Sequence, residues 1–564
     1  MSCASLSSLH PTNLHLAFPS NWTLKSLRKR TGISDSVSPE RSTSKPEKKQ
    51  QRSSQGKSIS SRKDDSLISN FHVSQPDTSP PLVTALKALA AQNAATFHFP
   101  GHNRGQAAPV SLTQLIGLKP FIHDLTGLQV LDKLFSPEGP IVEAQKQAAK
   151  LFGSLETWFL VGGTTSGIQA AIMATCSPGE HIILPRNCHV SAISAMVLSG
   201  AIPKYIIPEY DSEWDIAGGI TPLQVEKAIK ELEMEGHKPA AVFVTSPTYN
   251  GICSNLNEIS QLCHCRKIPL IADEAHGAHL GFHPQLPLSA LKQNADLVVQ
   301  STHKVLSSLT QSSMLHMSGN IVDRERISRC LQTLQTTSPS SLLLASLDAA
   351  RAQLSENPET IFHETMKLAI ESKELIKKIP GITWLELPPS FCKFPAKDPL
   401  RLTVGFWQLG LSGCKAGDIL YRNHGIVPEL VESRSITLAI NLGTCKEHVQ
   451  RLVSGLEELS ASSLKTGTEE KVKNGENIPF TDISMSLNPR DAFFAKKRRV
   501  SIGESLGKAC GELISPYPPG IPVMIPGEVI TERALDYLLD VISKGAVING
   551  ASDPQLSSIV ICNV

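Results

Sequence analysis

The sequence has no long uninterrupted apolar segment. None of its apolar runs approaches the roughly 18 residues that a helix needs to cross a bilayer, although 41% of the 564 residues are hydrophobic. We therefore expect no transmembrane helix. The length exceeds that of one ordinary domain, and we expect roughly two to four.

The chain also has little net charge, +2 at neutral pH, and this charge is unevenly distributed. Residues 1–63 contain 12 Lys and Arg against 3 Asp and Glu, whereas residues 64–564 contain 42 against 49. A mildly acidic body lacks the basic surface that binding to nucleic acid requires. We therefore expect no nucleic-acid partner.

The first 34 residues contain no Asp or Glu. They are rich in Ser, carry four basic residues between positions 25 and 30, and lack the compact apolar core of a secretory signal. This composition predicts a transit peptide for the chloroplast (plastid stroma), with a mitochondrial one or a plain disordered tail as the alternatives. Residues 34–78 continue as Ser-, Lys- and Gln-rich sequence that cannot bury a core.

The cysteines form neither a disulfide framework nor a zinc-binding pattern. Twelve of them are spread at irregular intervals, and Cys263-His264-Cys265 has no second pair of ligands at the spacing of a zinc site. Because a secretory signal is also missing, we interpret them as reduced thiols and expect no metal.

From about residue 140 the sequence alternates between short apolar runs and amphipathic stretches. The runs TWFLV, HIILP, AAVFVTSP, PLIADEA and ADLVVQS end in polar or turn residues, and helical stretches such as TSGIQAAIMATC separate several of them. This alternation predicts an α/β fold with a mostly parallel sheet covered by helices on both faces. Ligands of such sheets bind beyond the carboxyl ends of the strands.

One of these runs ends in Ser301-Thr302-His303-Lys304. A lysine at the end of a buried strand is costly, because its ammonium resists leaving water. One explanation is that Lys304 holds a carbonyl compound as a Schiff base. Ser301 and His303 are then placed to reach a phosphate of the same compound.

Two other strand ends carry residues suited to the same compound. The turn VGGTTSG places Thr164, Thr165 and Ser166 at the start of a helix, where free N–H groups suit a phosphate, although a simple N-cap is the alternative. His189 begins a helix after HIILP and is a candidate to stack on a ring, with capping or packing as the alternative.

The segment LIADEAHGAHLG contributes a carboxylate at a third strand end. Asp273 is suited to hold a protonated pyridine nitrogen, and the competing hypothesis is a metal site made with His276 and His279. The order of glycine-rich turn, His189, Asp273 and Lys304 is that of a pyridoxal-phosphate enzyme with the aspartate aminotransferase fold.

Motifs over about three-quarters of the chain resemble those of the bacterial-type ornithine/lysine/arginine decarboxylases. The resemblance is strongest to their shorter, plant- and Bacillus-like branch without a wing domain. The motifs include FHFPGHNRG (97–105), DLTGLQVLDKL (124–134), TSPTYNG (245–251), DEAHGAH, STHK, LTQSSMLH (309–316), QTTSPSSLLLASLDAAR (335–351) and SPYPPGIPVMIPGE (515–528).

The resemblance implies pyridoxal 5'-phosphate as cofactor and a role for each candidate residue. Lys304 would form the Schiff base, Asp273 would pair with the ring nitrogen, and Lys304 or His276 would return the proton after carbon dioxide leaves. The implied cofactor-binding residues are Thr164, Thr165, Ser166, His189, Asp273, Ala275, Ser301, His303 and Lys304. The substrate-binding candidates are Glu528, for the distal cation or else a structural cap, His102 and Tyr249.

The resemblance predicts decarboxylation of lysine, ornithine or arginine to cadaverine, putrescine or agmatine. One alternative is another reaction on the same scaffold, such as transamination, for which Arg401 or Arg434 would clamp the substrate carboxylate. The other is a cofactor-binding but inactive homologue. It is motivated by Asn103 and Gly127, which stand where many relatives have Lys and Glu.

The resemblance and the composition together predict the organisation of the chain. The expected fold is an aspartate aminotransferase-like large domain (fold type I) with smaller α/β carboxy-terminal domains, assembled as a homodimer or a dimer of dimers. The expected parts are a transit peptide and linker (1–78), an amino-terminal arm (79–140), a cofactor domain (141–350), a small α/β domain (351–460), a flexible linker (461–478) and a carboxy-terminal domain (479–564).

Overall fold

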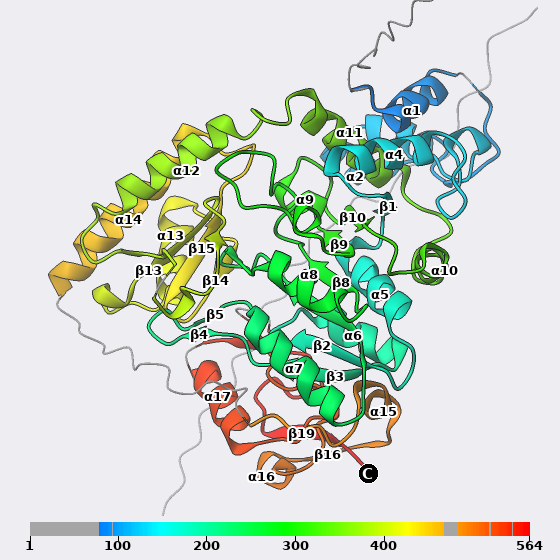
Figure 1. Ribbon diagram of the computed structural model, residues 1–564. Helices are drawn as coiled ribbons and strands as arrows, with labels where there is room; N and C mark the ends of the chain where they lie inside the picture. The colour runs from blue at the N-terminus through cyan, green and yellow to red at the C-terminus, as the bar shows by residue number, and fades with distance from the viewer. Residues whose placement is uncertain are drawn as a thin grey trace, which may run out of the picture. The chain divides into compact units, whose positions relative to one another are not determined.

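The computed structural model describes most of the chain after residue 77 (Figure 1). The described residues are 78–92, 94–387, 389–466, 482–517, 521–543 and 545–563. The predicted transit peptide and most of the predicted linker at 461–478 therefore lie outside the described residues. Within the described ranges, no helix combines the length and the apolar character needed to span a bilayer.

A seven-stranded sheet forms the centre of the fold. Five neighbouring strands run parallel, and β10 runs antiparallel to both of its neighbours, which confirms a mostly parallel sheet. In spatial order the strands are β1 (Glu156–Leu160), β10 (Ser313–Met317), β9 (Leu297–Gln300), β8 (Leu270–Asp273), β6 (Pro239–Thr245), β2 (His181–Pro185) and β3 (Ile202–Ile206).

Alternate residues of each strand enter two different apolar cores, one on each face of the sheet. In β6, Val242 and Val244 belong to one core, and Ala241 and Phe243 belong to the other. The first core is completed by α4 (Pro140–Phe152), α7 (Pro222–Met234), α8 (Leu256–His264) and α11 (Ser341–Glu356). The second is completed by α5 (Gly163–Thr175), α6 (Val190–Ser199) and α10 (Arg324–Leu334) (Figure 1).

Helix α5 lies unusually close to the sheet because of one glycine. A Cβ atom added at Gly167 would come within 2.6 Å of Val299 Cγ1 and 2.7 Å of Leu160 Cδ1, so a larger residue would push the helix away. Gly163, the first residue of the helix, has φ +72°, which favours glycine. These two glycines fix the start of α5 against the carboxyl end of β9.

A second, four-stranded antiparallel sheet follows in the sequence. Its strands are β11 (Thr383–Trp384), β13 (Arg401–Gly405), β15 (Ser435–Ala439) and β14 (Leu430–Val431). Helices α12 (His363–Ile376), α13 (Gly413–His424) and α14 (Lys446–Thr466) contribute apolar side chains to the core on this sheet. The short strand β12 (Ala396–Lys397) pairs with β7 (Ile252–Cys253) and ties this part to the loop after β6.

The last part of the chain has an apolar core of its own. Two antiparallel ribbons, β16 (Lys497–Ser501) with β19 (Ser558–Cys562) and β17 (Ser515–Tyr517) with β18 (Val547–Asn549), pack with α17 (Glu532–Ser543). The short helices α15 (Pro489–Phe494) and α16 (Ile502–Ser505) complete this part.

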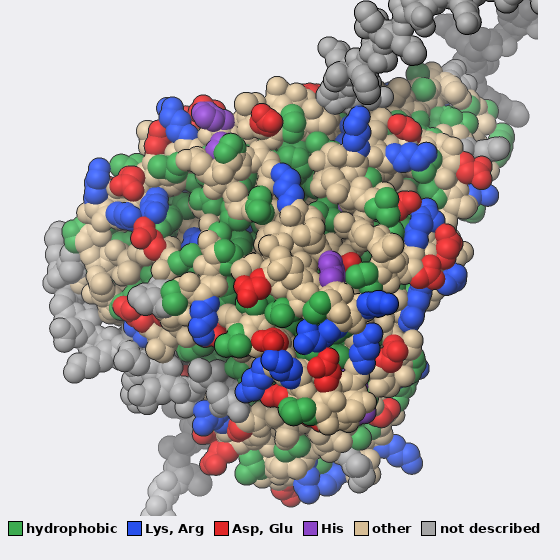
Figure 2. All heavy atoms as spheres, viewed as in Figure 1, with side chains coloured by type: hydrophobic (Ala, Val, Ile, Leu, Met, Phe, Trp, Pro, Cys, Tyr) green, Lys and Arg blue, Asp and Glu red, His purple; other side chains and the backbone are tan. Residues whose placement is uncertain are grey.

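The segment before the central sheet is helical, with α1 (Pro81–Ala91), α2 (Val110–Ile116) and α3 (Lys119–His123). Asp348 of α11 accepts a hydrogen bond from the Leu82 N–H at 2.8 Å, and this bond fixes the start of α1. On the face shown in Figure 2, Lys and Arg side chains are interspersed with Asp and Glu. The division at residues 78, 140, 350, 460 and 478 stays a prediction.

Candidate active site

Lys304 and His276 meet beyond the carboxyl ends of two neighbouring parallel strands. Lys304 lies in α9 (Thr302–Val305), directly after β9, and His276 follows β8. Lys304 Nζ is 3.0 Å from His276 Nε2. The Tyr249 ring packs edge-on against His276 with 4.9 Å between centroids. The structure therefore brings these three predicted site residues together.

The surroundings of Lys304 and His276 favour the uncharged form of both side chains. Burial lowers the pKa of Lys304, while the carboxylates of Asp273 and Glu429 oppose this shift. Burial, together with the positive charge of Lys304 and of Arg401, lowers the pKa of His276 well below its ordinary value. His276 is therefore neutral near pH 7, and its Nε2 shares one hydrogen bond with Lys304 Nζ. Its Nδ1 is buried without a hydrogen-bond partner among the described residues.

Asp273 presents a carboxylate at the end of β8. One oxygen, Oδ1, accepts a hydrogen bond from the Ala275 N–H at 3.1 Å, and Oδ2 has no such partner in the described part of the chain. Burial raises the pKa of Asp273, and the nearby His189 and Lys304 act in the opposite direction. A buried carboxylate with one free oxygen is suited to a ligand cation such as a protonated ring nitrogen.

Three hydroxyl groups converge at the start of α5. Thr164 Oγ1 lies 2.5 Å from Ser301 Oγ and 3.0 Å from Ser313 Oγ. No side chain of the preceding residue caps the helix, so the N–H groups of its first turn are available to an anion. Ser313, on the antiparallel strand β10, was not among the predicted residues.

The other predicted phosphate-binding residues differ from Thr164 and Ser301 in their exposure and in their hydrogen-bond partners. Thr165 is exposed, whereas Ser166 donates its hydroxyl hydrogen to the Gly163 carbonyl at 2.9 Å. His303 Nδ1 lies 2.8 Å from the Ser312 carbonyl, and the Thr302 hydroxyl is buried without a described partner. A phosphate group fits this set of hydroxyl and N–H groups.

His189 is the N-cap of α6, shortly after the carboxyl end of the parallel strand β2, and its side chain is exposed. Its Nδ1 accepts a hydrogen bond from the Ser191 N–H at 3.2 Å and lies 2.9 Å from the Ser191 hydroxyl. These contacts fix the ring orientation. The charge of the His189 ring lowers the pKa of Asp273 and so opposes the effect of burial.

Glu528 lies in a different environment from Lys304. Its two oxygens accept hydrogen bonds from Arg186 Nε and Nη2, both at 2.8 Å, and Oε2 also accepts one from the Ile525 N–H at 2.9 Å. Both side chains of this ion pair are buried. Because its carboxylate is already engaged, we do not include Glu528 in the proposed substrate site.

His102 and the two departures from the family motifs lie in the amino-terminal arm. His102 Nε2 is 3.3 Å from Asp124 Oδ2, and its ring packs edge-on against Phe121, so its described contacts stay within the arm. Asn103 has φ +44° and Gly127 has φ +67°. The backbone at Gly127 therefore favours glycine over the Glu of relatives, because it is left-handed.

Two charged residues of the second sheet region influence the Lys304 cluster. Arg401 is buried and donates a hydrogen bond from Nη2 to the His276 carbonyl at 3.2 Å. Glu429 is exposed, and its charge opposes the burial that lowers the pKa of Lys304. It also adds to the raised pKa of Tyr249, after burial, Asp273 and Cys188. No spacing rule in the sequence pointed to Glu429. Arg434 instead stacks over the Trp407 ring.

Solved lysine decarboxylases have this fold. The constitutive lysine decarboxylase of Escherichia coli matches with a TM-score of 0.74 at 22% identity, covering 86% of this chain and 82% of that one. The Francisella novicida lysine decarboxylase LdcF matches with a TM-score of 0.71 at 24% identity, covering 86% and 79%. The predicted aspartate aminotransferase-like fold is thereby confirmed.

Sequence comparisons identify the family. The Orn/Lys/Arg decarboxylase major-domain model matches residues 80–390, and the C-terminal-domain model of the same family matches residues 477–547. The arginine decarboxylase of Bacillus subtilis is 37% identical over 86% of this chain and 98% of its own length. That of Halalkalibacterium halodurans is 39% identical over 84% and 95%. The chain belongs to the Orn/Lys/Arg decarboxylase family, which confirms the predicted enzyme class, a decarboxylase of basic amino acids.

These relatives contradict the predicted chloroplast location. The matching arginine decarboxylases come from Bacillus subtilis and Halalkalibacterium halodurans, which are bacteria and have no plastids. The chloroplast prediction is therefore wrong. It was based only on the composition of the first 34 residues, which lie outside the described residues. A basic, Ser-rich composition is a weak signal because it specifies no contact or geometry.

Proposed function

We propose that this protein decarboxylates arginine to agmatine with pyridoxal phosphate as cofactor. Arginine is chosen as the substrate because of the level of sequence identity to arginine decarboxylases. Arginine decarboxylases are 37–39% identical over nearly their whole length, whereas the constitutive lysine decarboxylase of Escherichia coli is 22% identical. Lysine and ornithine are the competing substrates.

The geometry of the site supports this cofactor. Thr164, Ser301 and the start of α5 would bind its phosphate, and the free oxygen of Asp273 would pair with its ring nitrogen. His189 would cover the ring, and Lys304 would hold its aldehyde carbon. When bound, pyridoxal phosphate supplies an electron sink for the pair released as carbon dioxide leaves.

The pair of Lys304 and His276 is suited to proton transfer. The 3.0 Å separation of their nitrogen atoms lets one hydrogen bond join them. His276 is neutral because burial lowers its pKa, and Tyr249 restricts the rotation of its ring. Arg401 fixes the backbone of the same loop through the His276 carbonyl. We propose that this pair returns the proton to the substrate α-carbon.

Glu429 is the proposed partner of the distal guanidinium of the substrate. It is exposed, yet its charge acts on both Lys304 and Tyr249. An exposed carboxylate whose charge acts on Lys304 and Tyr249 is suited to a guanidinium, which it can bind through two hydrogen bonds. This proposal replaces the sequence-based choice of Glu528.

Carbon dioxide release from carboxyl-labelled arginine, lysine and ornithine tests the proposed substrate. The full chain loaded with pyridoxal phosphate is expected to prefer arginine, with kcat/KM at least about 10-fold above that for lysine or ornithine. A higher kcat/KM for lysine or ornithine would contradict the arginine proposal. Transfer of the amino group without carbon dioxide release would instead indicate transamination.

Glu429→Gln and Glu528→Gln form a matched pair that tests the substrate carboxylate. Glu429→Gln is expected to raise KM for arginine about 10-fold or more, because hydrogen bonds to charged groups contribute about 1.5–3 kcal/mol. Glu528→Gln is expected to lower the thermal midpoint and leave KM unchanged. The opposite result, a raised KM only in Glu528→Gln, would restore the sequence-based assignment.

We also propose that the protein assembles as a homodimer or a dimer of dimers. The amino-terminal arm exposes several large apolar side chains, a pattern typical of an interaction surface. They include Phe97, Phe99, Val110, Leu112, Leu115, Ile116 and Leu118. Sedimentation velocity of the loaded enzyme tests this proposal, and a monomer at micromolar concentration would contradict it.

A further inference from the structure

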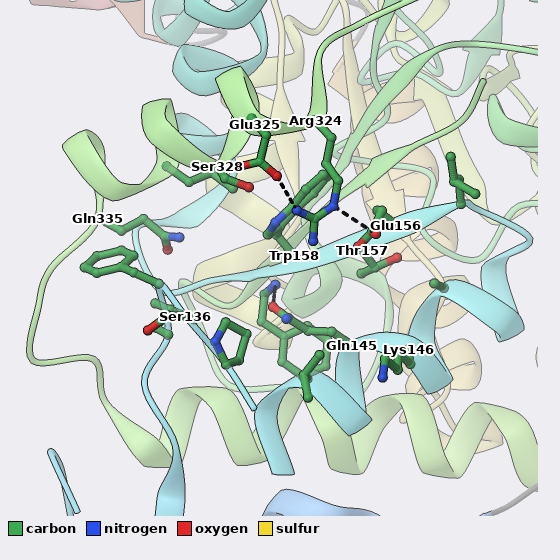
Figure 3. Close-up of a pocket in the computed structure, with 18 residues that line it drawn as sticks. Ser136, Gln145, Lys146, Glu156, Thr157, Trp158, Arg324, Glu325, Ser328 and Gln335 are labelled. Atoms are coloured by element: carbon green, nitrogen blue, oxygen red, sulfur yellow. Dashed lines mark hydrogen bonds and ion pairs between the residues drawn. The ribbon is translucent and has the colours of Figure 1, made fainter. Parts of the chain in front are cut away.

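A cavity of about 500 Å³ lies between α4, β1 and α10 (Figure 3). None of Lys304, His276 and Asp273 lines it. The Trp158 side chain borders it on one side, and Gln145 and Lys146 of α4 border it on the other (Figure 3). Its volume is within the range of pockets that bind small molecules. It is therefore a candidate binding site distinct from the proposed active site.

The amide groups of two buried glutamines have a fixed orientation in this cavity. Gln145 Oε1 accepts a hydrogen bond from the Phe159 N–H at 2.9 Å, and Gln335 Oε1 accepts one from the Val161 N–H at 2.9 Å. A carbonyl oxygen accepts and an NH₂ group donates, so these bonds decide which end of each amide faces the backbone. The NH₂ groups of both residues are left for the cavity.

Neither NH₂ group has a hydrogen-bond partner among the described residues, although Gln145 is 6% and Gln335 is 8% exposed. A buried amide that donates no hydrogen bond is costly unless a ligand or water accepts one. Both residues line the cavity. The two donors therefore point to an acceptor inside the cavity, either water or a ligand.

One cation at the cavity, Lys146, can meet an acceptor of negative charge. The two carboxylates that line it, Glu156 and Glu325, are both paired with Arg324, at 3.0 and 2.9 Å. Lys146 has no ion pair with any described residue. The two carboxylates share one guanidinium, so the four ionised groups that line the cavity balance in charge. The Lys146 ammonium and the two NH₂ groups are the lining donors without a partner in the described part of the chain (Figure 3).

We propose that this cavity binds a small organic carboxylate whose flat apolar part lies against Trp158. The two amides bond to Phe159 and Val161, which are two positions apart in the chain. Each NH₂ group can therefore donate to one oxygen of a single carboxylate. Lys146 at the rim supplies the opposite charge. A cationic ligand would meet the two NH₂ donors and the Lys146 ammonium, and both carboxylates are already bonded to Arg324.

Calorimetric titration of the full chain loaded with pyridoxal phosphate, with benzoate as the probe, tests this proposal. Benzoate combines a carboxylate with a flat ring, and the cofactor blocks the competing anion site at α5. Gln145→Glu and Gln335→Glu each keep an oxygen for the backbone N–H and replace the NH₂ donor with a charged acceptor. Either change is expected to raise the benzoate Kd at least about 10-fold, because a repulsion replaces a hydrogen bond.

Lys146→Met provides an independent variant, since Lys146 is exposed and its replacement leaves the core intact. It is expected to weaken benzoate binding about 3- to 10-fold. Inorganic phosphate and agmatine serve as comparison probes. Unchanged benzoate binding in all three variants would overturn the proposal. The proposal would also be overturned if the unaltered protein did not bind benzoate and the two Glu variants bound agmatine more tightly than the unaltered protein.

Discussion

Replacing Lys304 with alanine is expected to lower kcat for decarboxylation by about 10³-fold or more. The variant loses the Lys304 amine, which would hold the cofactor and which lies 3.0 Å from His276 Nε2. Carbon dioxide release measures the loss of activity. Cofactor absorbance measures the loss of the covalent link, because a lysine-bound pyridoxal phosphate absorbs at a longer wavelength than the free aldehyde.

Lys292→Ala is the matched control for this experiment. Lys292 is exposed at its tip and donates to the Gly281 carbonyl at 2.7 Å, away from the Lys304 cluster. Its replacement is expected to leave kcat and absorbance unchanged. If Lys304→Ala retained more than about a tenth of the activity, Lys304 would not be the lysine that holds the cofactor.

Replacing Arg186 with methionine is expected to lower the free energy of unfolding by about 3–5 kcal/mol. Arg186 is 0% and Glu528 is 4% exposed, so the variant leaves a buried carboxylate without its cation. It also removes the donors to the Pro522 and Val523 carbonyls, at 2.6 and 3.1 Å. Denaturant unfolding, followed by fluorescence, measures this loss.

The double variant Arg186→Met, Glu528→Leu tests the cause. Replacing both partners removes the uncompensated charge, and the double variant is expected to be more stable than Arg186→Met alone. If the two were equally unstable, the loss would come from the carbonyl groups of Pro522 and Val523. A single variant as stable as the unaltered protein would show that the ion pair contributes nothing.

The sequence predicted the central part of the fold because its signals are local. Each predicted run, such as HIILP and ADLVVQS, contains a strand of the central sheet, and their apolar continuity follows from burial on both faces. Residues that directly follow parallel strands also lie at the same edge of the sheet, so their side chains can meet. The structure accordingly brings Lys304, His276 and Tyr249 together, and Thr164 and Ser301 together.

The antiparallel strand β10 could not be predicted in the same way. Its sequence, SMLHM, contains His316, whose polar ring breaks the apolar run. The structure shows why the ring can be buried, since its two nitrogens hydrogen-bond to Thr157 at 2.8 Å and Gln300 at 3.1 Å. Thr157 is 159 residues away in the sequence and Gln300 lies 16 residues away, on the neighbouring strand β9. Ser313, which joins the Thr164 cluster, was missed for the same reason.

The choice between Glu528 and Glu429 also depended on distant contacts. A carboxylate beside a family motif is a reasonable candidate for a substrate cation, and the sequence favoured Glu528 for that reason. Its partner Arg186 lies far away in the chain, and no spacing rule connects the two. Glu429 precedes the short strand β14, and only the folded chain brings its charge near Lys304.

The two glutamines at β1 have a consequence for how copies of the protein meet at high concentration. Strand β1 is an edge of the central sheet, and an open edge is a template on which a strand of another molecule can add. At Phe159 and Val161 the outward N–H groups already bond to Gln145 and Gln335, and Gln311 donates to the Val161 carbonyl at 2.6 Å. A strand of another molecule would therefore have to break these bonds before it could pair with this end of β1.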